Sequence, residues 1–287
     1  MTDLRPPLSD MPPIICRLCD GTAQFAFHKL LIGKYQVAFY RCNACGSLQS
    51  ETPYWLNEAY SSSVQQIDPG AAQRVLDCVG LVYVMAKAFG FRRMLDFGGG
   101  SGLLCRLLRD AGYDAYWYDG YSRPGYAAGF EASPEANFDL VTAIEVVEHF
   151  PEPKKDFAQL LSGKPSAVLL KTWLYTGEGE DWWYIAPEEG QHIFFYSPEA
   201  MALIARQHGY HLLICSGFIL LIKSAPSRLQ RFILEKILTP ARLPLIRLWA
   251  LHHQCDAPLR DSALLEARAR QNMQTRESVA DTAKDAK

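Results

Sequence analysis

The chain has 287 residues, of which 49% are hydrophobic, and its formal net charge at pH 7 is -2. This length exceeds one average domain, and the composition is that of a globular protein with a sizeable core. Because both signs of charge are mixed along the chain, the composition does not indicate a general affinity for nucleic acid or for acidic surfaces. The opening residues, MTDLRPPLSDMPP, do not read as a signal peptide, and no apolar stretch is long enough to span a bilayer, so we expect a cytoplasmic protein.

Four of the eight cysteines form two CxxC turns, Cys16 with Cys19 and Cys42 with Cys45, separated by 22 residues. In the cytosol thiols stay reduced, so these residues are better metal ligands than disulfide partners. Four thiolates at the corners of a tetrahedron suit zinc, and a site closed at all four positions is structural. The doubled motif therefore predicts a structural zinc site, the alternative being two unrelated turns with idle thiols.

The segment between the two turns, QFAFHKLLIGKYQVAFYRC, alternates in hydrophobicity and is rich in aromatic and β-branched residues. This pattern predicts a two-stranded ribbon within a zinc-binding module at residues 1–62. So small a module has little apolar mass, and we expect the metal to contribute to its folding free energy. Its basic residues are too few for phosphate contacts, which argues against nucleic acid as a partner.

From residue 70 onward, helical patterns alternate with short buried strands. A long helix, AAQRVLDCVGLVYVMAKAFGF, precedes a strand, RRMLDFG, and the alternation continues to a strand pair in HLLICSGFILLIKS. The order of elements predicts an α/β domain with parallel strands at residues 63–225. In such a domain the ligand binds at the carboxyl ends of the strands.

The stretch LDFGGGSG, at residues 95–102, follows the first strand of this domain. Glycines there let the main chain touch a ligand that any side chain would displace. Asp119 ends the next strand, where its carboxylate can accept hydrogen bonds from two vicinal hydroxyls. A dinucleotide fingerprint in the same frame would require glycine at position 103, which is Leu103, so a hydride-transfer enzyme is disfavoured.

These motifs, together with FDLVTAIEVVEHF, resemble those of the class I S-adenosylmethionine-dependent methyltransferases over roughly residues 94–224. The resemblance implies a Rossmann-like, seven-stranded domain that transfers a methyl group from S-adenosylmethionine to a small-molecule acceptor. It also implies roles for six residues. The methionine part of the cofactor would lie against Asp96, Phe97 and the backbone of Gly98 and Gly100, the ribose hydroxyls would bind Asp119, and the sulfonium or adenosine edge would lie beside Glu145.

The turns CRLC and RCNACGSLQ ahead of such a domain resemble bacterial enzymes that methylate sugars, including deoxysugar C-methyltransferases with an N-terminal zinc module. The resemblance implies a role in glycan biosynthesis, with a nucleotide- or lipid-linked sugar as the candidate acceptor. Those enzymes carry a further C-terminal α/β domain, for which residues 226–287 are too short. Their specific reaction is therefore not carried over.

The loop EDWWYIAPEEGQHIFFYSPEA follows the fifth strand, and its QHIFFYS resembles the histidine-containing loop of the sugar C-methyltransferases. We expect His192 to act as general base, because its unperturbed pKa near 6.5 suits proton removal around neutrality, with Tyr184 assisting. The alternative is that the aromatic residues cap the core above a packed histidine.

Residues 226–253 mix arginines with large apolar residues and are interrupted by Pro240 and Pro244, which predicts two short amphipathic helices. These helices would pack on the body of the protein, on a second copy or on an anionic membrane surface. The polar residues up to 287 predict a frayed helix and tail, completing a helical extension at 226–287. A different functional class stays open, in which the chain is a zinc-ribbon binding or scaffold protein with an inactive methyltransferase-like domain.

Overall fold

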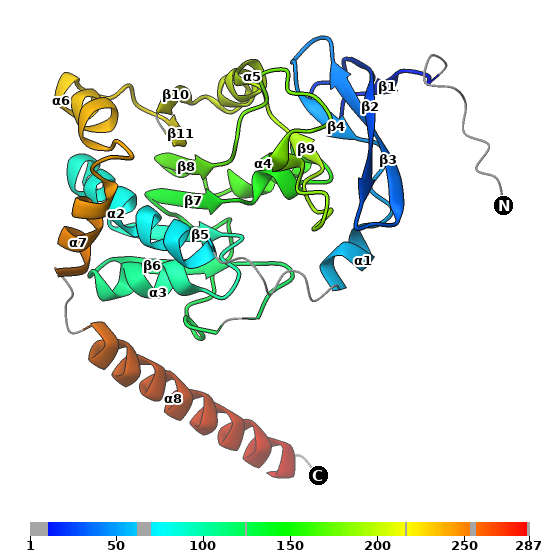
Figure 1. Ribbon diagram of the computed structural model, residues 1–287. Helices are drawn as coiled ribbons and strands as arrows, with labels where there is room; N and C mark the ends of the chain where they lie inside the picture. The colour runs from blue at the N-terminus through cyan, green and yellow to red at the C-terminus, as the bar shows by residue number, and fades with distance from the viewer. Residues whose placement is uncertain (1–10, 62–69, 124, 216, 253–256, 286–287) are drawn as a thin grey trace.

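The main layer of the protein is a six-stranded mixed sheet (Figure 1). The computed structural model describes residues 11–61, 70–123, 125–215, 217–252 and 257–285. The strands of this sheet are β5 (Arg93–Phe97), β6 (Asp114–Tyr118), β7 (Leu140–Ile144), β8 (Ala167–Lys171), β10 (His211–Cys215) and β11 (Phe218–Ile222). Their order is β10-β11-β8-β7-β5-β6. The strands β5 to β8 run parallel, whereas β11 is antiparallel to both β8 and β10, so the predicted α/β alternation and final strand pair are confirmed.

Within the described residues the sheet has six strands, so the seventh that the resemblance implied is not confirmed. Next to β6 the chain makes a single parallel bridge between Trp117 and Glu131. The backbone of Trp117 donates to Phe130 and accepts from Ala132, over 3.1 and 3.0 Å, and the pairing goes no further. The sequence of residues 120–138 is rich in glycine and proline, which are poor ladder formers, and this is consistent with a single bridge among the described residues there.

Helices cover both faces of the six-stranded sheet (Figure 1). Successive strand residues point to opposite faces, so Leu95 packs towards one layer and its neighbour Met94 towards the other. The layer that includes Leu95 contains α4 (Pro153–Leu160) and α5 (Pro198–His208). The layer that includes Met94 contains α2 (Ala71–Phe89), α3 (Leu103–Asp110) and α7 (Leu243–His252).

A second, antiparallel sheet lies at the N-terminal end of the protein, in the order β1-β2-β3-β4-β9. It consists of β1 (Ile14–Ile15), β2 (Thr22–Leu31), β3 (Tyr35–Cys42), β4 (Leu48–Ser50) and β9 (Phe194–Phe195), and α1 (Leu56–Ser61) follows β4. The strands β2 and β3 form the predicted ribbon. The last strand, β9, comes from a distant part of the sequence and pairs through Leu48 with Phe195 and Gln49 with Phe194. We call these five strands the ribbon sheet.

The described part of the C-terminal extension is mostly helical. Helix α6 (Arg228–Phe232) runs into a π-helical turn (Ile233–Ile237), and α7 is followed by α8 (Ala257–Asp285), which projects from the body (Figure 1). The guanidinium of Arg109 on α3 fixes α8 by donating to both carboxylate oxygens of Asp261 over 2.7 Å. In the part of the chain that the structure describes, no helix combines the length and apolar character needed to cross a membrane. The predicted domain boundary at 62/63 lies outside the described residues, and that at 225/226 stays a prediction.

Candidate functional site

The glycine-rich loop connects the end of β5 to the start of α3. Gly98, Gly100 and Gly102 all have left-handed backbones, with φ of +70°, +55° and +76°. A Cβ at Gly98 would lie 2.6 Å from Val146 Cγ2, so the side chain is excluded there by protein packing. A Cβ at Gly100 would meet no atom within 4 Å. The loop is therefore packed against the protein at Gly98 and open to a ligand at Gly100.

Two carboxylates flank this loop. Asp96, beneath the loop, is buried, and its Oδ1 accepts a hydrogen bond of 2.9 Å from the Thr142 hydroxyl. Burial raises the pKa of Asp96 to about 7. Asp119, at the end of β6, accepts from the Gly100 N–H over 2.9 Å and from the N–H groups of Tyr121 and Ser122 over 2.8 Å. The predicted residues Asp96, Gly100 and Asp119 thus lie at one edge of the sheet, and Phe97 is buried beside them.

Glu145 begins the acidic loop after β7 and has an unusual backbone. Its φ is +53°, a conformation that costs free energy for a residue with a side chain, and its N–H donates to the Lys171 carbonyl over 2.8 Å. The short helix η3 (Val147–His149) follows and brings Glu148 to the same side. The hydroxyl of Tyr184 lies 2.8 Å from Glu145 Oε2 and 2.6 Å from Glu148 Oε1. Burial raises the pKa of Glu145, the negative charge of Glu148 raises it further, and the pKa reaches about 7.

The predicted base, His192, lies in this same cluster. Its Nδ1 is 2.6 Å from the carbonyl oxygen of Tyr184, which only accepts, so Nδ1 carries the proton in the neutral ring. Its Nε2, the free acceptor, is 4.0 Å from Glu148 Oε1. The ring centroid of His149 is 4.9 Å from that of His192. Burial lowers the pKa of His192, and it lowers that of His149 to about 3, so both imidazoles are neutral.

The sequence analysis brought Tyr184, His192 and Glu145 to the site but assigned no role to two of their neighbours, Glu148 and His149. Glu148 has an exposed fraction of 0% and contacts Tyr184 directly. The signal that could have found it is the ExxEH spacing, which places both glutamates on one side of a single turn.

Backbone hydrogen bonds tie the loop that carries His192 to the ribbon sheet. The N–H of Ile193 donates to the Glu148 carbonyl over 3.0 Å. Its carbonyl accepts from the Ser50 N–H over 3.0 Å and from the Arg17 guanidinium over 2.7 Å. Trp55 also donates from its indole to the Gly190 carbonyl over 2.7 Å. The ribbon sheet therefore forms one wall of the cluster.

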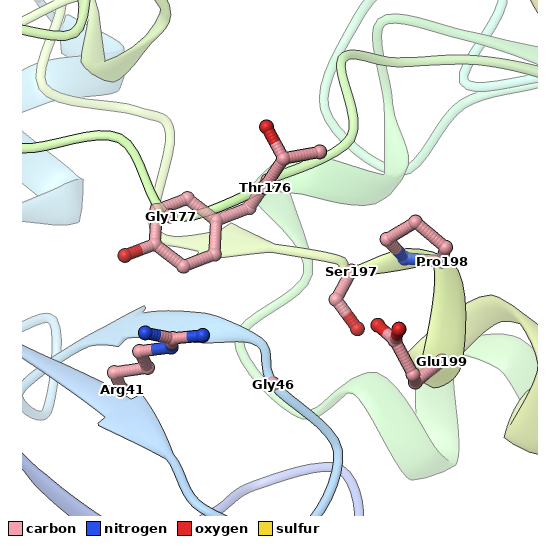
Figure 2. Close-up of a pocket in the computed structure, with 8 residues that line it drawn as sticks. Arg41, Gly46, Thr176, Gly177, Ser197, Pro198 and Glu199 are labelled. Atoms are coloured by element: carbon pink, nitrogen blue, oxygen red, sulfur yellow. The ribbon is translucent and has the colours of Figure 1, made fainter.

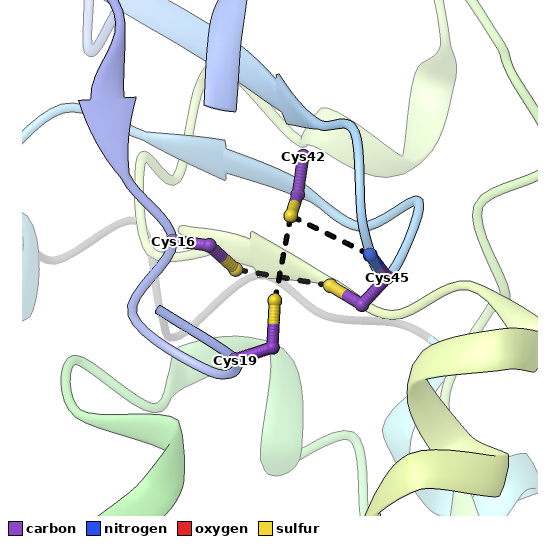
Figure 3. A group of neighbouring side chains, drawn as sticks. All are labelled: Cys16, Cys19, Cys42 and Cys45. Carbon is purple, nitrogen blue, oxygen red and sulfur yellow. Dashed lines mark hydrogen bonds between the residues drawn. The ribbon is translucent and has the colours of Figure 1, made fainter. Parts of the chain in front are cut away.

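The four sulfurs of the CxxC turns face one another (Figure 3). The sulfurs of Cys16 and Cys45 are 3.7 Å apart, and those of Cys19 and Cys42 are 3.5 Å apart. Zn–S bonds of about 2.3 Å in a tetrahedral site give sulfur–sulfur edges of about 3.8 Å. A Cβ at Gly21 would lie 2.8 Å from the Ala44 side chain and 3.3 Å from two of these sulfurs. The donor set and its spacing fit zinc.

A separate pocket lies between the ribbon sheet and the N-terminus of α5 (Figure 2). It is lined by Arg41, Gly46, Tyr175, Thr176, Gly177, Ser197, Pro198 and Glu199. It shares no residue with the glycine-rich loop or with the cluster around His192, and we assign it no part in cofactor binding.

Comparison with known proteins gives a family for the larger part of the chain. The profile of the family described as "Methyltransferase domain" matches residues 69–213, about half of the chain. No curated protein matches the sequence. The magnesium protoporphyrin IX methyltransferase from Synechocystis PCC 6803, solved with bound SAH, is 16% identical and has a TM-score of 0.42, with 59% of this chain and 93% of that chain covered. The sugar N-methyltransferase KedS8 from Streptoalloteichus sp ATCC 53650 is 12% identical, with a TM-score of 0.40 and coverage of 57% and 94%.

The contact of Gly98 with Val146 predicts a measurable loss of stability in the variant Gly98→Ala. The left-handed backbone and the clash together should lower the free energy of unfolding by about 2 to 4 kcal/mol. Gly33→Ala is the matched control, because Gly33 has a φ of +63° and no atom within 4 Å of its Cβ position, and it should lose only about 1 kcal/mol. Urea denaturation measures both, and equal losses would contradict the packing role of Gly98.

Proposed function

Since the chain belongs to the methyltransferase domain family, we propose that it transfers a methyl group from S-adenosylmethionine to a small-molecule acceptor. The observation that carries the proposal is the convergence of three features at one sheet edge. These are the left-handed glycine loop at 98–102, the Asp119 carboxylate and the acidic loop at 145–149. Such an edge, at the carboxyl ends of parallel strands, is where open α/β sheets bind their ligands.

The donor would lie along the glycine-rich loop. Asp96, Phe97 and the backbone of Gly98 and Gly100 would hold its methionine part, since Gly100 has open space above it. Asp119 would accept the ribose hydroxyls. Three N–H groups already fix the Asp119 carboxylate, so little ordering entropy would be lost when the donor binds. Glu145 would lie beside the sulfonium, whose positive charge favours a neighbouring carboxylate.

His192 and Tyr184 would act on the acceptor. The acceptor nucleophile attacks the methyl carbon in line with the sulfur, the S–C bond breaks, and S-adenosylhomocysteine leaves. The acceptor proton passes to His192 Nε2, which the Tyr184 carbonyl keeps in the required tautomer. Trp173 and Trp183, 54% and 63% exposed, form an edge-to-face pair beside Tyr184 with centroids 5.3 Å apart. Their exposed faces suit the stacking of a sugar ring, which supports a sugar or glycan precursor as acceptor.

We further propose that the four cysteines of the ribbon hold a structural zinc ion. Four sulfur ligands leave no open position for substrate or water, so the ion would contribute to folding and not to methyl transfer. The ribbon sheet in turn supports the loop of His192 through Ser50, and the turn between β1 and β2 supports it through Arg17.

The role given to Asp119 predicts that Asp119→Ala weakens the binding of S-adenosylmethionine by about 2 to 4 kcal/mol, because the hydrogen bonds to both ribose hydroxyls are lost. Asp139→Ala is the matched control. Asp139 also accepts two backbone N–H groups, those of Arg92 and Arg93 over 2.8 and 2.9 Å, but at the amino ends of the strands. Calorimetry on both folded variants should show a loss in Asp119→Ala alone.

Unchanged affinity in Asp119→Ala would contradict the assignment of the donor site. If the parent protein binds no S-adenosylmethionine, the alternative of a binding or scaffold protein with an inactive domain gains support. Mass spectrometry of candidate glycan precursors for the gain of one methyl group then tests the acceptor.

The zinc proposal predicts one zinc ion per chain in elemental analysis of the purified protein. Cys42→Ser should lose that ion and unfold at a lower temperature, because the metal's binding free energy contributes to folding. Cys215→Ser, which removes a thiol of β10 outside the ribbon sheet, should retain the zinc. A parent protein without stoichiometric zinc would refute the site.

A further inference from the structure

A second group of side chains has the composition and spacing of a metal site. Glu148, His149 and His192 each offer one ligand atom, and these three atoms lie within 4.8 Å of one another. We propose that this triad binds a divalent transition-metal cation, separate from the cysteine site of the ribbon. Two imidazoles and one carboxylate form a donor set that suits Zn²⁺, Mn²⁺ and Fe²⁺.

Both imidazoles are held by the backbone through one nitrogen and leave the other nitrogen free. His192 donates from Nδ1 to the Tyr184 carbonyl over 2.6 Å, and its Nε2 faces Glu148. The backbone of Gln191 hydrogen-bonds to the ring of His149, whereas the buried Nδ1 of His149 has no partner. Metal-binding histidines are commonly held in this way, because the outer hydrogen bond fixes both the tautomer and the ring orientation.

One oxygen of the Glu148 carboxylate also lacks a hydrogen-bond partner. The residue has an exposed fraction of 0%, and Tyr184 donates only to its Oε1, over 2.6 Å. Its Oε2 is buried without any hydrogen-bond partner. A buried carboxylate oxygen left unpaired costs considerable free energy. A cation between Glu148, His149 and His192 would satisfy this oxygen and the free nitrogen of His149 together.

The loops that carry the ligands are already joined. Glu148 and His149 lie on η3, and the hydrogen bond from the Ile193 N–H to the Glu148 carbonyl, 3.0 Å long, joins that helix to the residue after His192. The Tyr184 hydroxyl lies within hydrogen-bond distance of both Glu148 and Glu145, and this contact holds the Glu148 ligand in place. Val146, which precedes η3, packs against Gly98, so a bound cation would lie beside the proposed donor site.

Three protein ligands leave open positions on a cation that prefers five or six. The ligand class that fits them is an acceptor with one or two oxygen donors, such as a hydroxyl or a vicinal diol, whose proton is more easily lost once the oxygen is bound to the metal. This consequence rests on the proposed function, whereas the metal site itself does not. In the metal-loaded protein His192 is then a ligand, and the cation takes over its part in activating the acceptor.

Mn²⁺ is the probe that separates this site from the cysteines, because it prefers oxygen and imidazole to thiolate. The full-length protein, with its ribbon zinc retained, is titrated with Mn²⁺ while the free ion is followed by electron paramagnetic resonance. We expect one bound Mn²⁺ per chain. Glu148→Gln and His149→Gln should each weaken binding at least about tenfold, whereas His208→Gln on α5 should leave it unchanged.

The melting temperature of each variant shows whether it is folded, and if Glu148→Gln is not, His149→Gln decides. No Mn²⁺ binding by the parent, or binding that both triad variants retain, overturns the metal site. Calorimetry with S-adenosylmethionine on the same preparations keeps the two proposals apart. Donor binding without Mn²⁺ binding refutes only the metal site, and Mn²⁺ binding without donor binding refutes only the proposed function.

Discussion

The residue on which the candidate site depends is Ile193, because its backbone joins three parts of the molecule. Its N–H donates to the acidic loop at Glu148, and its carbonyl accepts from the ribbon sheet at Ser50 and from Arg17. The strand β9 follows directly and pairs with β4. The residue before it is His192. The ribbon sheet is thus part of the wall of the site, and the metal proposed for it would stabilise that wall from a distance.

The site buries carboxyl groups next to neutral imidazoles, and this arrangement determines which charges the site favours in a ligand. Glu148 and Asp96 are buried, and burial raises the pKa values of both. Neither histidine of the cluster supplies a compensating charge, because burial lowers the pKa of each. An environment with excess acceptors and few donors favours positively charged ligands. The sulfonium of the proposed donor and the proposed divalent cation would both meet that preference.

Local patterns in the sequence were sufficient to predict much of this arrangement. The helix over 71–89, the glycine-rich loop with Asp119 and the grouping of four cysteines each depend on residues near one another in the chain or on a fixed spacing. The pairing of β4 with β9 could not be predicted in the same way, because it joins Leu48 to Phe195 and has no local signal. The same holds for Glu148, whose role depends on Tyr184 being folded over it. The seven strands were expected from the resemblance alone, and the described residues form six, with glycine and proline frequent in the sequence of residues 120–138.

The most direct test of this account is hydrogen exchange, followed by mass spectrometry, in the parent protein and in Cys42→Ser. If the ribbon sheet holds the acceptor side of the site, loss of its metal should speed amide exchange both at 48–50 and at 190–196. The central strand β5 should keep its protection, because its partners β6 and β7 lie outside the ribbon sheet. Faster exchange confined to the ribbon, with the amides at 190–196 as protected as before, would show that the loop of His192 does not depend on the ribbon and would contradict the account.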